Sequence, residues 1–215
     1  MSKNKTIILA TALLGLALGG CEKDETDNIS KVFTVPTITL NGEKAVSVPV
    51  GGTYTDAGAK YVGETGEQVD LQSTSSNVNT AQPGLYIVQY EKTSASGIYE
   101  TYEERIVVVT SVNNPIDYSG TYLRPATGVN AFVTKVGNGL YEVQNPGGAA
   151  VGANTTIYFG EIAPNTFIAP TQVTQEGEME VTDIKFILSD NTPTGSTWRV
   201  LNTGYGTGLR TFVKQ

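Results

Sequence analysis

Three glutamates near the C-terminal end of the chain are the residues whose spacing could serve acid–base chemistry. Glu176, Glu178 and Glu180 are two residues apart, so on a β-strand they would lie on one face. A glycosidase needs two carboxyl groups that flank one glycosidic bond. No other motif supports catalysis, and we favour a solvated strand face that discourages edge-to-edge pairing.

Other catalytic and metal-binding chemistry has few candidate residues. The chain has no histidine and one cysteine, which excludes Ser-His-Asp and Cys-His catalysis and a Cys/His zinc cluster. Calcium binds six to eight oxygens, and four acids near predicted loops lack Asp-x-Asp spacing: Asp56, Glu64, Glu67 and Asp70. We expect no enzymatic activity, no cofactor and no metal.

Aromatic residues are candidates for ligand binding, because an exposed ring can stack on the apolar face of a sugar. The candidates are Trp198, Tyr158 and Tyr205. Trp198 shares a strand face with Val200, so a place in the core is the interpretation that we favour for it. Tyr205 lies in Gly204–Gly208, which we predict to be a turn or bulge rather than a phosphate loop, because no helix follows.

These residues are carried by a sequence that is typical of β-structure throughout. Hydrophobic residues make up 39% of the chain and charged residues 16%, and 24 glycines separate short β-branched and aromatic runs. The first half predicts strands at Thr37–Leu40, Ala45–Val48, Leu85–Tyr90 and Tyr99–Thr110, with a hairpin turn at Asn41-Gly42 between the first two.

The second half predicts further strands after a break at Asn114-Pro115, where we place a domain boundary. Gly137–Gly139 predicts a hairpin between strands at 131–136 and 140–143. We predict a longer loop, Ser189–Ser196, between strands at 184–188 and 197–201, and a last strand at 209–214.

Two segments of the first half resemble a known family. Val48–Ala59 and Gln82–Tyr90 are similar to bacterial immunoglobulin-like surface domains related to HYR modules, and the resemblance covers residues 36–112. Thr93–Ile98 departs from the family's usual Asp-x-x-Gly-Asn turn. The resemblance implies an Ig-like β-sandwich that acts as a spacer or display module, and it brings no catalytic residue.

The second half resembles a group of lipoproteins. Asp117–Tyr122 and Gly139–Val143 are similar to the C-terminal region of Bacteroidetes lipoproteins that also begin with an Ig-like domain. Those proteins tend to accompany outer-membrane glycan-uptake systems. Because residues 116–215 again consist of predicted strands and turns, we expect a second antiparallel β-sandwich or a barrel-like domain there, in an all-β chain.

The N-terminus resembles the leader of a bacterial lipoprotein. Lys3 and Lys5 precede the apolar run Ile7–Leu18, which is too short to span a membrane. Gly19-Gly20-Cys21 resembles a lipobox, which implies a signal peptide over residues 1–20 and a lipid on Cys21. The alternative is a plain secretory signal in which Cys21 has no role.

Residues 21–35 are predicted to form an acidic tether behind the lipid. Lys23, Asp24 and Glu25 resemble the signal that exports Bacteroidetes lipoproteins to the cell exterior, and the alternative is a solvated linker. The net charge of −7 disfavours nucleic acid as a partner. We expect a surface lipoprotein of the outer membrane that binds a glycan, or else a structural partner of an outer-membrane protein complex.

Overall fold

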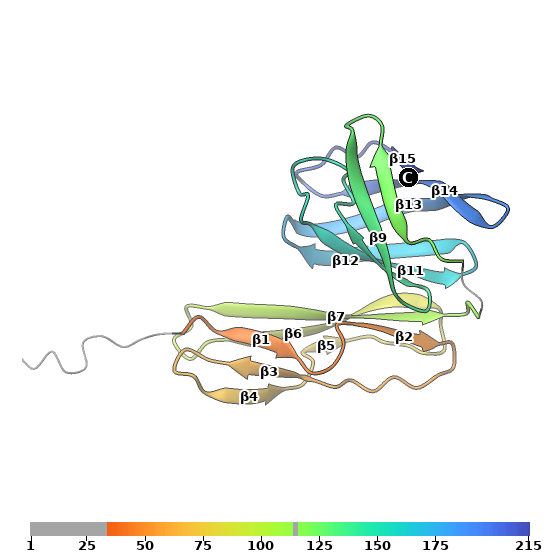
Figure 1. Cartoon of the computed structure of the whole chain (residues 1–215). Coiled ribbons are helices and arrows are strands. Elements are labelled where there is room, and N and C mark those ends of the chain that lie inside the picture. Colours follow the sequence, from red (N-terminus) through yellow and green to blue (C-terminus); the bar gives the residue numbers. More distant parts are fainter. Residues whose placement is uncertain (1–33, 114–115) are drawn as a thin grey trace, which may run out of the picture. The chain divides into compact units, whose positions relative to one another are not determined.

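The computed structural model describes residues 34–113 and 116–215. The described residues all belong to one compact unit, Thr34–Gln215. The predictions for Cys21, Lys23, Asp24 and Glu25 lie outside the described residues. The described part contains fifteen strands and no helix (Figure 1), which confirms the predicted all-β class.

The N-terminal part is a sandwich of two sheets (Figure 1). One sheet has the order β1-β3-β4, with strands Thr37–Leu40, Ala59–Val62 and Gln68–Leu71. The other has the order β2-β7-β6-β5, with strands Ala45–Pro49, Glu100–Thr110, Gly84–Thr93 and Ser75–Ser76. Alternate residues of both sheets, among them Tyr61, Val88, Tyr90 and Val107, fill the core between them.

The predicted hairpin at Asn41-Gly42 is wrong, because β1 and β2 belong to different sheets. β1 pairs antiparallel with β3, and β2 runs parallel to β7. The crossing between the sheets is held by Arg105, which donates to the carbonyls of Asn41 (2.5 Å), Glu43 (3.0 Å) and Gly58 (3.2 Å). A contact with a residue about sixty positions away thus overrides the local turn signal.

The C-terminal part is a closed eight-stranded antiparallel barrel (Figure 1). Its strands follow one another around the barrel, and β15 closes it by pairing with β8 through Val213 opposite Leu123. The strands β8 to β15 are Gly120–Arg124, Val129–Gly137, Leu140–Gln144, Thr156–Ala163, Thr166–Thr174, Gly177–Ser189, Thr192–Leu201 and Arg210–Lys214. The barrel confirms the barrel-like alternative predicted for this part of the chain.

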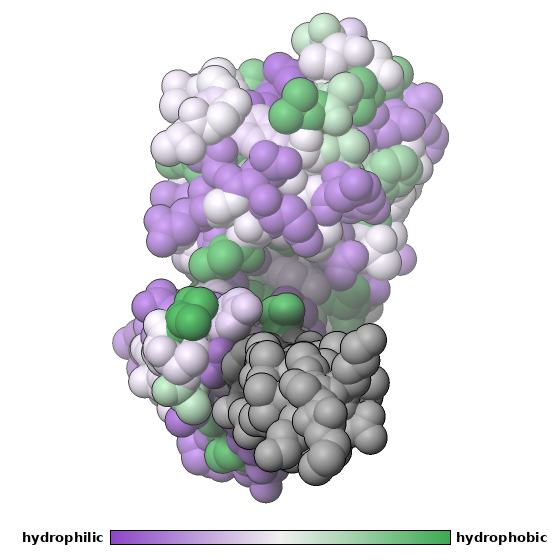
Figure 2. Space-filling view, turned by 90° about the vertical axis from the view of Figure 1, so that its left-hand side faces the viewer, coloured by the Kyte–Doolittle hydropathy of each residue, from purple (hydrophilic) through white to green (hydrophobic). Residues whose placement is uncertain are grey.

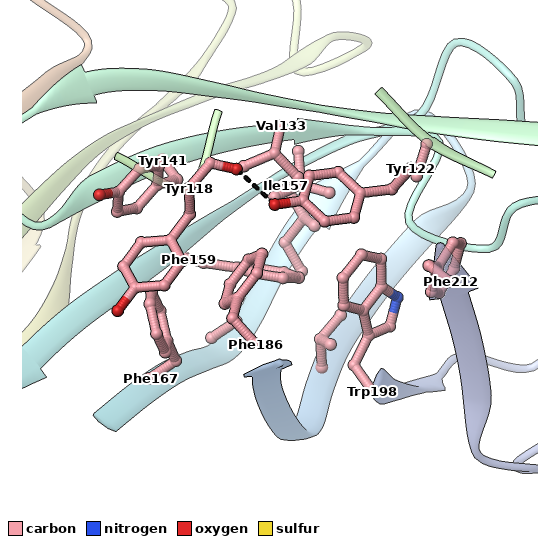
Figure 3. Close-up of a cluster of buried hydrophobic side chains, with 14 of the residues drawn as sticks. Tyr118, Tyr122, Val133, Tyr141, Ile157, Phe159, Phe167, Phe186, Trp198 and Phe212 are labelled. Atoms are coloured by element: carbon pink, nitrogen blue, oxygen red, sulfur yellow. Dashed lines mark hydrogen bonds between the residues drawn. The ribbon is translucent and has the colours of Figure 1, made fainter. Parts of the chain in front are cut away.

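Aromatic side chains occupy the inside of the barrel (Figure 3). Trp198 stacks on Phe212 with ring centroids 4.1 Å apart and meets Phe159 edge-on at 5.5 Å. Tyr118 packs on Phe186 at 4.6 Å, and its carbonyl accepts a 2.7 Å hydrogen bond from the Tyr122 hydroxyl. Eight strands enclose a space that side chains can just fill. Here the protein's own aromatic residues fill it.

The predicted loop at Ser189–Ser196 is also wrong. β13 and β14 are joined by two residues, Asp190 and Asn191, with φ of 49° and 61°. Positive φ at both central residues is what a type I′ hairpin turn requires, and Asn and Asp tolerate it. Pro193 lies in β14 where the pairing with β13 shifts register, a position that tolerates its missing N–H.

The sheet and the barrel share a small apolar cluster and several hydrogen bonds. Leu85, Ile106 and Val108 pack with Leu140 of the barrel, so the apolar run of β7 is buried on both faces. The Thr110 hydroxyl donates to the carbonyl of Glu161 at 2.6 Å. The unit Thr34–Gln215 is therefore held together by direct packing as well as by the chain connection.

Candidate functional site

The three aromatic ligand-binding candidates have different surroundings. Trp198 has no exposed surface, and its Nε1 donates to the carbonyl of Pro146 at 2.7 Å. Its ring therefore offers no face to a ligand, which corrects its place among these candidates. Tyr158 and Tyr205 are half-buried, and each lines a separate hollow.

The hollow beside Tyr158 is a groove of about 480 Å³ between the β2-β7 edge and the barrel. The Tyr158 hydroxyl donates to Glu142 at 3.1 Å, and Gln172 bonds both the N–H and the carbonyl of Tyr158 at 2.8 Å. On the sheet side, Lys44 pairs with Glu103 at 2.6 Å. The polar groups of this groove thus bind one another to a large extent.

Glu104 is the buried acid of this groove, with 6% of its surface exposed. It accepts hydrogen bonds from the Tyr102 hydroxyl and, at 3.3 Å, from the backbone N–H of Val173 in the barrel. Burial is the largest influence on its pKa, and it outweighs these bonds and the charge of Lys44, so the pKa is raised. Ionisation of Glu104 therefore works against the folded state.

We expect Glu104→Gln to be more stable than the wild type at neutral pH. A raised pKa means that stability is present below the ordinary value of 4.5 and is lost as pH rises through the folded-state value. Glutamine cannot ionise, and its amide can donate to the Tyr102 oxygen while its carbonyl accepts from Val173. Urea midpoints measured from pH 4 to 8 should converge at low pH and separate as pH rises.

Glu103→Gln is the control, because its charge is partly exposed and paired with Lys44. The urea midpoint of Glu103→Gln should not rise relative to that of the wild type as pH increases. A constant difference between Glu104→Gln and the wild type across the range would contradict the raised pKa.

The hollow beside Tyr205 lies at one end of the barrel and measures about 440 Å³. Tyr205 is seated against two glycines of the β10–β11 connection. A Cβ at Gly147 would lie 2.4 Å from its ring, and one at Gly152 would lie 1.7 Å from its hydroxyl. The Tyr205 hydroxyl also donates to the carbonyl of Val151 at 3.3 Å. The ring is therefore packed against this connection, and the residue also lines the hollow.

Two arginines, Arg124 and Arg210, line the same hollow. We name these two residues together with Tyr205 the barrel-end site. Arg210 is 4% exposed and donates to the carbonyls of Gly206 (2.8 Å) and Gly208 (3.3 Å). Its guanidinium carbon lies 5.8 Å from the Tyr205 ring centroid. Arg124 donates to the carbonyl of Gly147 at 3.0 Å.

The charges of the barrel-end site are not balanced by the described part of the chain. Across residues 34–113 and 116–215, neither Arg124 nor Arg210 forms an ion pair with a carboxylate. The Nε of Arg210 is buried without a hydrogen-bond partner. Burial, followed by the charge of Arg124, lowers the pKa of Arg210, and an arginine still remains protonated.

Of the glutamates singled out for catalysis, Glu178 and Glu180 lie at the start of β13, and Glu176 lies in the exposed turn before it. Glu178 is exposed and the next residue, Met179, is buried, so the two lie on opposite faces of the strand. The carbonyls of Glu176 and Glu178 accept hydrogen bonds from the Asn202 side chain, at 2.9 and 2.7 Å. These contacts give the segment a role in holding the turn.

Three of the four acids considered for calcium have structural partners. Asp56 pairs with Arg105, and Glu64 accepts hydrogen bonds from the hydroxyl (2.6 Å) and N–H (3.0 Å) of Ser96. Glu67 accepts from the hydroxyl of Thr65 at 2.8 Å. In the described residues no group of three or more Asp, Glu, His or Cys is arranged to hold a metal ion.

The two arginines of the barrel-end site were not among the residues singled out from the sequence. A signal for Arg210 is present: it alternates with Phe212, so the two share a face of β15, and that face points inward. Arg124 has no comparable signal, because its position beside Arg210 depends on how the barrel closes.

Comparisons with known proteins bear on the sandwich. Residues 38–109 match the family "Bacterial surface protein, Ig-like domain", which shows that this part of the chain is an Ig-like domain. The crystal structure of the lipoprotein BT2262 from Bacteroides thetaiotaomicron aligns over 84% of this chain and 100% of that one, with 19% identity and a TM-score of 0.38. A TM-score of this size does not establish a common fold.

No curated protein sequence matches the chain. Among the residues that the structure describes, no helix has the length and apolar character needed to cross a membrane.

Proposed function

We propose that this protein is a non-enzymatic lipoprotein of the cell surface whose barrel binds an extracellular glycan. Cys21 would carry the lipid in the outer membrane, and Lys23, Asp24 and Glu25 would direct the protein to the cell exterior. The Ig-like domain would lift the barrel from the membrane. The match of residues 38–109 to a bacterial surface domain supports a location on the cell surface.

The barrel-end site is the observation that carries the glycan proposal. The barrel interior is filled by aromatic side chains, so a ligand has to bind on the outside or at an end. The site combines an aromatic ring, polar donors and a hollow of about 440 Å³, which lies in the range of small-molecule sites. Tyr205 would stack on a sugar ring, as proposed from the sequence. Tyr158 is the weaker candidate, since the polar groups around it bind one another: Glu142 accepts from its hydroxyl, and Gln172 binds its backbone N–H and carbonyl.

A glycan array tests this function with the full chain carrying Cys21→Ser, which removes the lipid. We expect binding to at least one glycan, and a loss of about tenfold or more in affinity with Tyr205→Ala, because the stacking surface is removed. Tyr99→Ala is the matched control, since Tyr99 is an exposed tyrosine of the sandwich. Absence of binding to every glycan would overturn the proposal.

The alternative function is that of a structural or adhesive partner of an outer-membrane protein complex, with no small ligand. A broad exposed apolar patch would favour it. On the face shown in Figure 2, the hydrophobic residues lie in separate groups among hydrophilic ones. This face therefore favours the glycan proposal.

A further inference from the structure

We infer that the barrel-end site binds an anionic sugar, one whose carboxylate or sulfate group is recognised by Arg124 and Arg210. This inference rests on the proposed function and names the class of glycan. It is carried by an imbalance of charge inside the fold, by the position of both arginines on one hollow, and by the open loop beside them.

The described part of the chain contains two buried arginines, Arg105 and Arg210. Arg105 is 2% exposed, and its charge is met by Asp56. Arg210 is 4% exposed, and its recorded partners are the neutral carbonyls of Gly206 and Gly208. Buried charges in proteins are normally paired with an opposite charge. Arg210 therefore lacks the counter-charge that Arg105 has.

Arg124 brings a second positive charge to the hollow. It lies at the end of β8, lines the same hollow, and adds a like charge that opposes the protonated form of Arg210. Two guanidinium groups that repel each other cost stability unless an anion lies between them or beside them. Guanidinium forks match the geometry of carboxylate and sulfate oxygens, which neutral sugars do not offer.

The hollow is accessible beside the loop that follows β14. The loop after β14 contains Gly206 and Gly208, and a Cβ at either position would meet no atom within 4 Å. Tyr205 forms one wall and remains half-exposed. The net charge of the chain is −7, so a positive hollow is a local exception on an acidic protein. An anionic ligand would therefore be attracted to this site and repelled by most other surfaces.

Arg210 could instead serve to hold the neighbouring loop in place through its hydrogen bonds to Gly206 and Gly208. Arg124 is therefore the better residue to test. The side chain of Arg124 makes one hydrogen bond, to the carbonyl of Gly147, and the residue is half-buried. Arg124→Gln keeps a donor of similar reach and removes the charge. Lys185→Gln is the matched control, because Lys185 is an exposed cation of β13 that does not line the hollow, whereas Arg199 donates to the carbonyl of Thr207 in the loop beside it.

The test titrates the full chain carrying Cys21→Ser with four probes by calorimetry. Oligogalacturonate carries carboxylates, its methyl-esterified form has the same backbone without charge, a 6-sulfated galactose oligomer carries sulfates, and its unsulfated form is neutral. We expect one or both anionic probes to bind about tenfold or more tightly than the neutral partner. Arg124→Gln should remove that preference, Lys185→Gln should retain it, and added salt should weaken it.

The outcomes separate this inference from the function on which it rests. Preference for carboxylate alone or sulfate alone would support the inference and identify the group. Equal binding of charged and neutral probes, or an unchanged preference in Arg124→Gln, would overturn the inference and leave glycan binding intact. No binding to any of these probes would overturn the inference, while the glycan array decides the function separately.

Discussion

Arg105→Ala is expected to lower the free energy of unfolding by about 3–5 kcal/mol, the usual cost of removing one partner from a buried ion pair. The substitution leaves Asp56 without its cation and the carbonyls of Asn41, Glu43 and Gly58 without their donor. It also removes the hydrogen bonds that hold the chain where it crosses from one sheet of the sandwich to the other. Urea unfolding followed by far-ultraviolet circular dichroism measures the loss.

The charge of Asp56 makes this loss larger than that of a neutral contact. Burial alone would raise its pKa, but hydrogen bonds from Tyr90 and Gly58 and the charge of Arg105 outweigh burial and hold the pKa below its ordinary value. Asp56 therefore stays ionised at neutral pH when its partner is removed. Asp56→Asn introduced into Arg105→Ala should recover part of the lost stability.

Arg199→Ala is the matched control for Arg105→Ala. Arg199 also pairs with an aspartate, but the side chains of Arg199 and Asp183 are 40% and 60% exposed. An exposed pair of this kind contributes about 0–1 kcal/mol. Equal losses from the two substitutions would contradict the role that we assign to Arg105 at the crossing.

Trp198→Ala is expected to destabilise the barrel by about 3–5 kcal/mol, because it opens a cavity in an aromatic core. The indole has no exposed surface, and it stacks on Phe212 and donates to Pro146. Urea unfolding followed by circular dichroism measures this loss as well. The fluorescence of the only tryptophan then serves to follow the barrel in the other variants.

Trp198→Phe separates a core role from a ligand-binding role. Phenylalanine loses the hydrogen bond to Pro146 but retains most of the packing. The free energy of unfolding should therefore fall less than in Trp198→Ala. Glycan binding by this variant should equal that of the wild type, because Trp198 offers no surface to a ligand. If the Trp198→Phe variant folds but no longer binds glycan, Trp198 contributes to the ligand site and the core role assigned to it is incomplete.

The all-β class follows from local features of the sequence. Alternation, β-branched and aromatic runs and glycine turns lie in the chain itself, and strand geometry repeats every two residues. The strand predicted at Leu85–Tyr90 is part of β6, and the predicted hairpin at Gly137–Gly139 joins β9 and β10. Trp198 and Val200 share the buried face that their spacing indicates.

Two turns show where local reasoning was insufficient. Asn41-Gly42 has the composition of a hairpin, but the buried guanidinium of Arg105 binds the carbonyls there and directs β2 to the other sheet. Between β13 and β14, a turn needs only Asp190 and Asn191, because pairing across a full barrel extends both strands toward each other. In both cases long-range pairing outweighs the local signal.

The barrel-end site was decided by tertiary structure. The sequence places Arg210 on the inward face of β15 by its alternation with Phe212. It contains no indication that Arg124, 86 positions earlier in the numbering, lies on the same hollow. That proximity arises when β15 pairs with β8 and closes the barrel. Closure sets which strand ends meet, because every strand must satisfy its backbone hydrogen bonds on both edges, and no local pattern encodes that partner.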